Sequence, residues 1–259
     1  MIPNLFILIL FLLVLLLIGW QIWVKNKKPE PVPFPTAWKQ ILNTKVAYYH
    51  ELPEEEKARF EREVQYFLDQ VSITGVEIDI QDSDRLLVAA SAVIPLFGFP
   101  QLRYRNIDEV LLYKGSFNAD NDTEGKERTI LGKVGSGNMN RLMILSLPAL
   151  RAGFENEQST GNVGIHEFVH LIDKADGATD GIPERIMQKQ YVIPWLHLMH
   201  EGIRKIRENE SDIDPYGSTN EAEFFSVVSE YFFTRPDLFQ QNHPELYQLM
   251  TRIYRQQPN

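Results

Sequence analysis

The first half of the chain alternates between two hydrophobic periods. After Pro53 and three glutamates, apolar residues recur at helical spacing up to residue 71, which predicts an amphipathic helix. Residues 76–80 alternate apolar with polar side chains, which is typical of a half-buried strand. Residues 85–94 are apolar on nearly all sides and predict a buried helix that ends at Pro95. Further strands are predicted for the short apolar runs 110–113, 129–133 and 142–147.

From residue 148 onward the period is helical. The predicted helices cover residues 165–172, 183–208, 221–233 and 244–255, and Pro194 is expected to kink the second of them. Strands early in the chain and helices late favour an α+β fold. About 220 residues can bury a sizeable core, so we expect a single body domain over residues 37–259.

The N-terminus carries a long uncharged apolar run. Leu5 to Val24 is interrupted only by Gly19 and Gln21, and no charged side chain precedes Lys25. At about 1.5 Å per residue, such a helix spans roughly 30 Å, the hydrocarbon thickness of a bilayer. A cleaved signal peptide would need basic residues before the run and small residues at a cleavage site, and the sequence has neither. Residues 1–28 are therefore predicted to be a transmembrane anchor with a basic flank.

Three lysines give this anchor a predicted direction. Lys25, Lys27 and Lys28 follow the apolar run at once, and the positive-inside rule places them in the cytoplasm. The protein would then be single-pass, with its N-terminus outside and its body domain in the cytoplasm. Residues 29–36 carry proline at every second position, which favours an extended, semi-rigid spacer between membrane and body.

The charge of the body excludes one class of partner. The whole chain has a net charge of −9, and without the three flanking lysines it holds 23 basic and 35 acidic side chains. Few cations are left to neutralise phosphates, which argues against nucleic acid as a partner. The sequence contains no cysteine, which excludes a disulfide scaffold and a cysteine nucleophile.

The clearest chemical signal is the pattern H-E-x-x-H, formed by His166, Glu167 and His170. On a helix, positions i and i+4 project from one face, so both imidazoles can reach one metal ion. Glu167 lies beside them, where it can take a proton from a water activated by the metal. Two neutral imidazoles and a carboxylate suit zinc and leave a fourth position open. Asn162 is the expected N-cap of this helix.

The third metal ligand must come from another segment, and the predicted helix 221–233 offers acidic candidates. Acids in so apolar a stretch are costly to bury unless they are paired or metal-bound. Glu223 and Glu230 are seven residues apart and share a face, whereas Glu221 suits the first turn of the helix. One of the pair is expected to be the ligand and the other to hydrogen-bond a ligating histidine. Spacing alone gives Glu223 only a small advantage.

Two more residues have alternative interpretations on the sequence alone. Asp173 lies one turn after His170, where it would either orient a ligand or simply end the helix. Tyr216 would either pack against its neighbours or donate a hydrogen bond to a developing oxyanion. Asp176 and Asp180 weakly suggest a calcium loop, but their spacing is wrong for an EF-hand and a polar turn is the preferred interpretation.

In combination, these motifs resemble the Mlc titration factor A family of zinc peptidases. The resemblance is carried by HEFVHLID, DPYGSTNEAEFFSVVSEYFF, DRLLVAASAVIPLFGFP and EVLLY, and it runs from about Trp38 to the last helix. It implies a gluzincin-like catalytic domain with aminopeptidase-like activity. By position, it implies zinc ligation by His166, His170 and Glu223, general-base catalysis by Glu167, and a transition-state role for Tyr216. The founding member binds a repressor, but the N-terminal anchor departs from that member and we do not carry the partnership over.

We therefore predict a zinc-dependent peptidase that acts on peptide or protein substrates. One alternative is a membrane-tethered regulatory protein that uses the zinc fold to hold a partner such as a transcription regulator. Another is a membrane-associated endopeptidase. The intact H-E-x-x-H pattern favours catalysis, because a protein that only binds a partner has no use for Glu167.

Overall fold

A computed structural model describes residues 15–17, 20, 33–118, 130–135, 140–155 and 160–258. The chain divides into two compact units, Met1–Pro33 and Phe34–Asn259. Among the described residues, no helix is both long and apolar enough to cross a membrane. Most of the predicted anchor, residues 1–28, and residues 29–32 of the predicted spacer lie outside the described residues. The structure therefore does not support the anchor, which stays a prediction.

The second unit contains a four-stranded sheet with the strand order β1-β2-β4-β3. Strands β1 (Ser72–Val76), β2 (Glu109–Tyr113) and β4 (Leu142–Ser146) are parallel, and β3 (Gly132–Val134) runs antiparallel to β4. The two central strands are part of the core, since every second residue of β2 and most of β4 are buried. Among the described residues, β3 forms one edge of the sheet.

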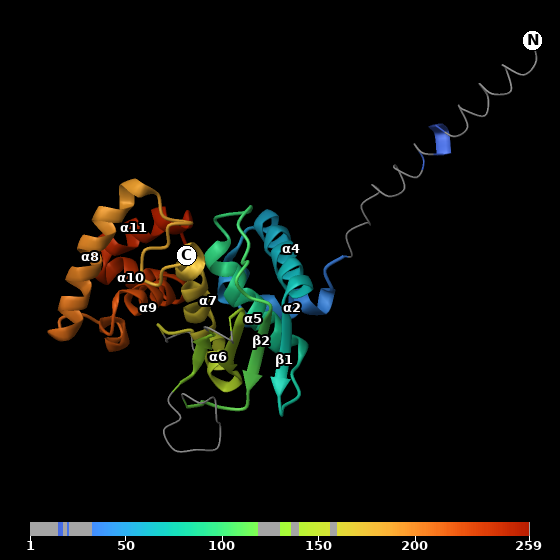
Figure 1. The fold of residues 1–259 in the computed structure, drawn as a ribbon, viewed down its shortest axis with the longest axis horizontal. Coiled ribbons are helices and arrows are strands. Elements are labelled where there is room, and N and C mark those ends of the chain that lie inside the picture. Colours follow the sequence, from blue (N-terminus) through green and yellow to red (C-terminus); the bar gives the residue numbers. More distant parts are fainter. Residues whose placement is uncertain are drawn as a thin grey trace, which may run out of the picture. The chain divides into compact units, whose positions relative to one another are not determined.

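Helices surround the sheet and make up the C-terminal half. The helices before and beside the sheet are α2 (Thr36–Lys45), α3 (Ala47–Glu51), α4 (Glu54–Gln70), α5 (Asp82–Leu96) and α6 (Leu147–Glu155). The later ones are α7 (Val163–Asp173), α8 (Lys189–Arg207), α9 (Glu221–Thr234), α10 (Pro236–Asn242) and α11 (Pro244–Tyr254), with short 3-10 turns η2 (Lys174–Asp176) and η3 (Pro215–Ser218). Figure 1 shows α7 between the sheet and the C-terminal helices, where it packs against both α5 and α9.

Helix α7 is buried because its neighbours approach it closely. A Cβ atom at Gly164 would lie 2.2 Å from Ser91 Oγ, so only glycine lets α5 and α7 pack at this distance. Further along α7, the ring of Phe168 packs edge-on against Phe67, with centroids 5.5 Å apart. The N-terminus of α7 is capped as predicted, since the Asn162 side chain accepts a hydrogen bond from the backbone N–H of Ile165.

The α+β prediction is confirmed, but several predicted boundaries are wrong. The first strand covers 72–76 rather than 76–80, because Glu77 adopts a left-handed backbone (φ 56°) and the chain turns back there. Ile78 and Ile80 then pack over Gly75 instead of extending the strand. The helix predicted from residue 183 begins only at Lys189, since residues 183–187 form a hydrogen-bonded turn. Pro95 lies inside the last turn of α5, and α2, α3, α6 and α10 were not predicted.

Candidate metal centre

Helix α7 presents His166 and His170 side by side. Their rings lie 4.7 Å apart between centroids, and their Nε2 atoms are 3.0 Å apart. The geometry follows from the i, i+4 spacing on a helix whose first turn is held by the Asn162 cap. Both imidazoles therefore point their Nε2 atoms at the same point in space.

Helix α9 brings Glu223 to this point. Its Oε2 atom lies 3.0 Å from His166 Nε2 and 3.2 Å from His170 Nε2. The donor atoms of these three residues all lie within 4.8 Å of one another, and the described residues contain no other such group of three. In tetrahedral zinc sites with bonds of roughly 2.0 to 2.2 Å, ligand atoms are separated by about 3.3 Å. The donor set and its spacing fit a zinc ion.

Two further side chains on the same face of α9 contact the other ring nitrogen, Nδ1, of each histidine. Glu230 Oε1 lies 2.6 Å from His166 Nδ1, and the second carboxylate oxygen of Glu230 accepts the backbone N–H of Asn162. Ser226 Oγ lies 3.2 Å from His170 Nδ1. The sequence analysis missed Ser226. Its position on the helix face shared by Glu223 and Glu230 was the available signal.

The neighbouring histidines and carboxylates of this group shift the pKa values of His166 and Glu223. Burial opposes the charged form of His166, but the carboxylates of Glu230 and Glu223 outweigh it and hold the pKa of His166 well above its usual value. Burial likewise opposes ionisation of Glu223, but hydrogen bonds from His166 and His170 lower its pKa to about 2. The carboxylate of Glu223 is therefore ionised at neutral pH, as a metal ligand must be.

Glu167 lies beside the histidines, against the edge of the sheet. Its side chain is buried, and burial raises its pKa above the usual value for a carboxyl group. A Cβ atom at Gly132 of β3 would come within 2.6 Å of Glu167 Cγ and Oε1. Glycine at this position thus allows the edge strand to pass directly over Glu167.

Tyr216 lies on the rim of the same site. Asp214 accepts the backbone N–H of Tyr216 at 2.8 Å and so holds the η3 turn that carries the tyrosine. The Tyr216 ring centroid lies 6.0 Å from that of His166, and 54% of the residue is exposed. Partial burial, with the nearby carboxylates of Glu223 and Glu167, raises the pKa of the phenol, which therefore carries its proton at neutral pH.

A cleft of about 700 Å³ adjoins the metal-ligand group. Its walls come from the segment leading into β3, from α6, from the start of α7, from η3 and from α9. The residues that line it are Ile130, Leu131, Gly132, Ala149, Ala152, Gly153, Thr160, Gly161, Asn162, Val163, His166, Glu167, Asp214, Tyr216, Val227, Glu230 and Tyr231. The volume lies within the range of ordinary ligand-binding clefts.

Comparison with known proteins agrees with this geometry. The family model described as "Glucose-regulated metallo-peptidase M90" matches residues 20–255. The chain belongs to the M90 family. The M90 chain is also similar to Mlc titration factor A of Escherichia fergusonii, with 29% identity over 257 residues that cover 93% of each protein. It shares 31% identity over 225 residues with Mlc titration factor A of Salmonella arizonae, covering 80% of this chain and 86% of that relative.

A third similar protein, from Synechocystis sp., is named "Uncharacterized protein slr2042". It is 28% identical over 250 residues, which cover 92% of the M90 chain and 90% of the relative. Membership of this family indicates a metallopeptidase-like fold. The group formed by His166, His170 and Glu223 could bind a metal ion. The names of the first two relatives point to a regulatory role for those proteins.

Asp173 stabilises a turn. Among the described residues, it makes no hydrogen bond to a histidine. One carboxylate oxygen accepts the backbone N–H of Gly181 at 3.0 Å, and the other has no hydrogen-bond partner among the described residues. Burial raises the pKa of Asp173 to about 6. The carboxylates of Asp176 and Asp180 accept backbone N–H groups of the same segment, so both belong to a polar turn, as expected.

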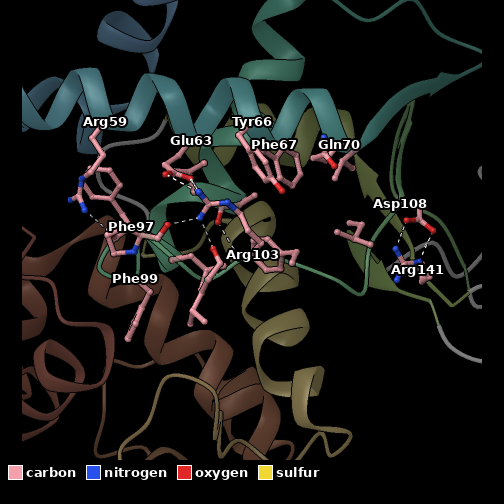
Figure 2. A pocket seen from close by; sticks show the side chains of 18 residues that line it. Arg59, Glu63, Tyr66, Phe67, Gln70, Phe97, Phe99, Arg103, Asp108 and Arg141 are labelled. Atoms are coloured by element: carbon pink, nitrogen blue, oxygen red, sulfur yellow. Dashed lines mark hydrogen bonds and ion pairs between the residues drawn. The ribbon is translucent and has the colours of Figure 1, made fainter. Parts of the chain in front are cut away.

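A second cavity of the M90 chain lies between α4, the end of α5 and the loop before β2. Its volume is about 160 Å³, and no residue of the metal-ligand group lines it. Figure 2 shows that its arginines are already engaged: Arg103 pairs with Glu63, Arg141 pairs with Asp108, and Arg59 donates to the Phe97 carbonyl. These contacts give no reason to assign a ligand to this cavity.

Proposed function

We propose that this chain is a zinc-dependent peptidase that hydrolyses peptide bonds in an aminopeptidase-like manner. The observation that carries the proposal is the convergence of His166, His170 and Glu223 on one point, with the buried carboxylate of Glu167 beside it. Membership of the M90 family supports peptide hydrolysis. The resemblance described above supports zinc as the metal.

The residues of the site have complementary parts in this mechanism. When bound, zinc supplies Lewis-acid activation of a water molecule and of the scissile carbonyl. Glu167 accepts the proton of the attacking water and later returns it to the leaving amine, and its raised pKa suits both transfers. Tyr216 carries its proton and donates a hydrogen bond to the developing oxyanion. Glu230 accepts the Nδ1 proton of His166, which would leave Nε2 as the atom that holds the metal together with His170 and Glu223.

The edge strand β3 supports a peptide as the substrate. The carbonyl of Leu131 and the N–H of Gly135 hydrogen-bond to β4, so by alternation the backbone groups of Gly132 and Val134 point away from it. An extended peptide can add to such an edge through main-chain hydrogen bonds. Gly132 lies over Glu167, which would bring the added peptide next to the proposed base.

The charge of the cleft supports attack at a free N-terminus. Its lining residues include the carboxylates of Glu167, Asp214 and Glu230 and no lysine or arginine. Glu230 is paired with His166 and Glu167 lies beside the proposed zinc position, so Asp214 is the carboxylate left to meet a charge of the substrate. A substrate ammonium group is attracted to this carboxylate. Asp214 is exposed at the rim, where an ammonium group could reach it.

The decisive experiment measures turnover of aminoacyl-nitroanilides by the zinc-loaded chain, with and without a chelator. We expect chelator-sensitive hydrolysis, and a loss of about 100- to 10,000-fold in kcat for Glu167→Gln, with zinc still bound. Glu221→Gln is the matched control, because Glu221 is exposed in the first turn of α9. Loss of zinc from Glu167→Gln would instead make Glu167 a ligand. Cleavage of N-acetylated peptides as fast as free ones would identify an endopeptidase.

A regulatory function is the second candidate, supported by the name Mlc titration factor A of two relatives. On this alternative the cleft would hold a segment of a transcription regulator or a similar protein without cleaving it. Binding of such a partner would survive Glu167→Gln and produce no new N-termini.

For residues 1–28 we propose a single-pass anchor that leaves the catalytic domain in the cytoplasm. The uncharged run before Lys25 supports it. Carbonate-resistant membrane fractionation together with protease protection tests both the anchor and its direction.

A further inference from the structure

Part of the wall of the cleft is formed by small and apolar residues. Helix α6 forms one wall through Ala149, Ala152 and Gly153, which share one face of the helix at i, i+3 and i+4 spacing. Val227 of α9 and Val163 of α7 also line the cleft. Leu147 and Leu150 on the other face of α6 are buried in the core, which fixes the helix in place.

Three buried polar side chains of the cleft wall already have hydrogen-bond partners. Asn162 accepts the N–H of Ile165 and donates to the carbonyl of Gly153 at 3.0 Å. Both carboxylate oxygens of Glu230 are engaged, one by His166 Nδ1 and one by the N–H of Asn162. The hydroxyl of Tyr231 donates to Asp212 at 2.6 Å. A polar side chain entering beside these three residues would therefore lose its hydration without gaining their hydrogen bonds.

The small side chains of α6 are what keep this region open. Gly153 cannot be enlarged without moving the cap, because a Cβ atom there would lie within 3.0 to 3.1 Å of Asn162 atoms. Ala152 is different, because it is exposed and lines the cleft without holding a neighbouring element. Its size can change the cleft while the core stays intact.

We infer that this region is a specificity pocket for a bulky apolar side chain of the substrate, next to the bond that is cut, and that Ala152 sets its capacity. The inference rests on the proposed peptidase function and names the substrate class of the same cleft. His166 and Glu167 line the cleft together with Ala152, so an occupant of the pocket lies adjacent to the metal centre. Burying one leucine side chain stabilises a complex by about 1.5 to 3 kcal/mol, which corresponds to about a 10- to 150-fold change in affinity.

The test compares two pentapeptides, Leu-Ala-Ala-Ala-Ala and Gly-Ala-Ala-Ala-Ala, whose first residue borders the bond that an aminopeptidase cuts. Their dissociation constants are measured by calorimetry on the zinc-loaded full chain carrying Glu167→Gln, so that no peptide is consumed. We expect the leucine peptide to bind about 10- to 150-fold more tightly. Adding Ala152→Leu fills the pocket, and the preference should fall to within about threefold. Ala58→Leu, the same change on the exposed face of α4, should keep the full preference.

The outcomes separate this inference from the proposed function. A leucine preference that survives both Ala152→Leu and a second variant, Ala149→Leu, overturns the pocket. Equal binding of the two peptides by the parent protein also overturns it. Hydrolysis is measured in parallel on the protein with Glu167 intact. If neither peptide is cleaved, the peptidase function is rejected. The pocket would still be supported if the parent prefers the leucine peptide and Ala152→Leu removes that preference. Faster cleavage of the leucine peptide than of the glycine peptide, with this difference lost on Ala152→Leu, supports both.

Discussion

At the scale of single residues, the site depends on side chains that hold the candidate metal ligands in place. In both His166 and His170, Nε2 lies near Glu223. The Nδ1 atom of His166 contacts Glu230, and that of His170 contacts Ser226. Such partners fix the tautomer and the ring orientation, and their loss typically weakens metal binding by about 10- to 100-fold. Glu230 and Ser226 therefore affect zinc affinity without touching the ion.

Replacing these partners should weaken zinc binding unequally. We expect Glu230→Gln to raise the zinc dissociation constant by about 10- to 100-fold and Ser226→Ala by up to about tenfold, since a neutral hydroxyl orients a ring less strongly than a carboxylate. Competition with a chromophoric chelator measures both. The matched control is Ser229→Ala, a buried serine of α9 that bonds Tyr254 instead of a histidine. If Ser229→Ala weakens zinc binding as much as Ser226→Ala, the Ser226 effect comes from general destabilisation of the protein.

Gly132 gives a second prediction at this scale. Gly132→Ala places a methyl group against Glu167, so the base or the edge strand must shift. We expect kcat to fall by at least about 100-fold, because small misplacements of a catalytic group are costly, while zinc stays bound. Gly115→Ala is the control, since a Cβ atom there meets nothing within 4 Å. Unchanged kcat in Gly132→Ala would show that Glu167 does not need its present position.

At the scale of elements, α7 and α9 together build the metal centre. Helix α7 supplies two candidate ligands and the proposed base, and one face of α9 supplies the third candidate ligand and both histidine partners. The C-terminal end of α7 is fixed by Asp173, which accepts the Gly181 N–H as the chain enters the following turn. This buried carboxylate makes the end of α7 sensitive to pH.

Asp173→Asn should change how stability depends on pH. The pKa of Asp173 is raised to about 6 in the folded state, against about 3.9 in the unfolded chain. Its stabilising contribution is therefore complete below about pH 3.9 and is lost as the pH rises through 6. Relative to the parent, the variant should gain about 1 to 2 kcal/mol in unfolding free energy between pH 5 and pH 8. Urea unfolding of the metal-free protein measures this gain. Asp79→Asn, at an exposed aspartate outside this contact, is the matched control.

At the scale of the whole second unit, a metal ion at this site joins segments far apart in the sequence. The α7 ligands follow the sheet, whereas Glu223 belongs to the C-terminal helices (Figure 1). A ligand that binds only the folded state stabilises it by about 4 kcal/mol at a concentration 1,000 times its dissociation constant. Metal occupancy should therefore raise the stability of the whole unit rather than that of one loop.

Calorimetry with and without a chelator tests this coupling. We expect zinc to raise the unfolding temperature by several degrees, about 2 to 4 °C per kcal/mol for a domain of this size. Glu223→Ala should abolish the increase, and Glu221→Ala should preserve it. A zinc effect that persists in Glu223→Ala would assign the third ligand to another residue.

The sequence alone was enough to predict α7 and the pairing of its histidines. Both depend on local spacing, because i and i+4 share a face wherever a helix forms. The acids of α9 were found in the same way, as costly charges in an apolar helix. The roles of Glu223 and Glu230 could not be separated by spacing. A seven-residue separation leaves both on one face, and only the packing of α9 against α7 shows which carboxylate meets Nε2 and which meets Nδ1.

Other features depended on contacts between distant segments. The turn at Glu77 moved the first strand away from its alternating residues, because pairing with β2 outweighed local pattern. Ser226, Gly132 and Ala152 are ordinary residues in the sequence, and their meaning comes from a histidine, a glutamate or a cleft supplied by another element. Local spacing therefore determined which residues can do chemistry. Long-range packing determined what each of them faces, because burial and hydrogen bonding are properties of the neighbours as well as of the residue itself.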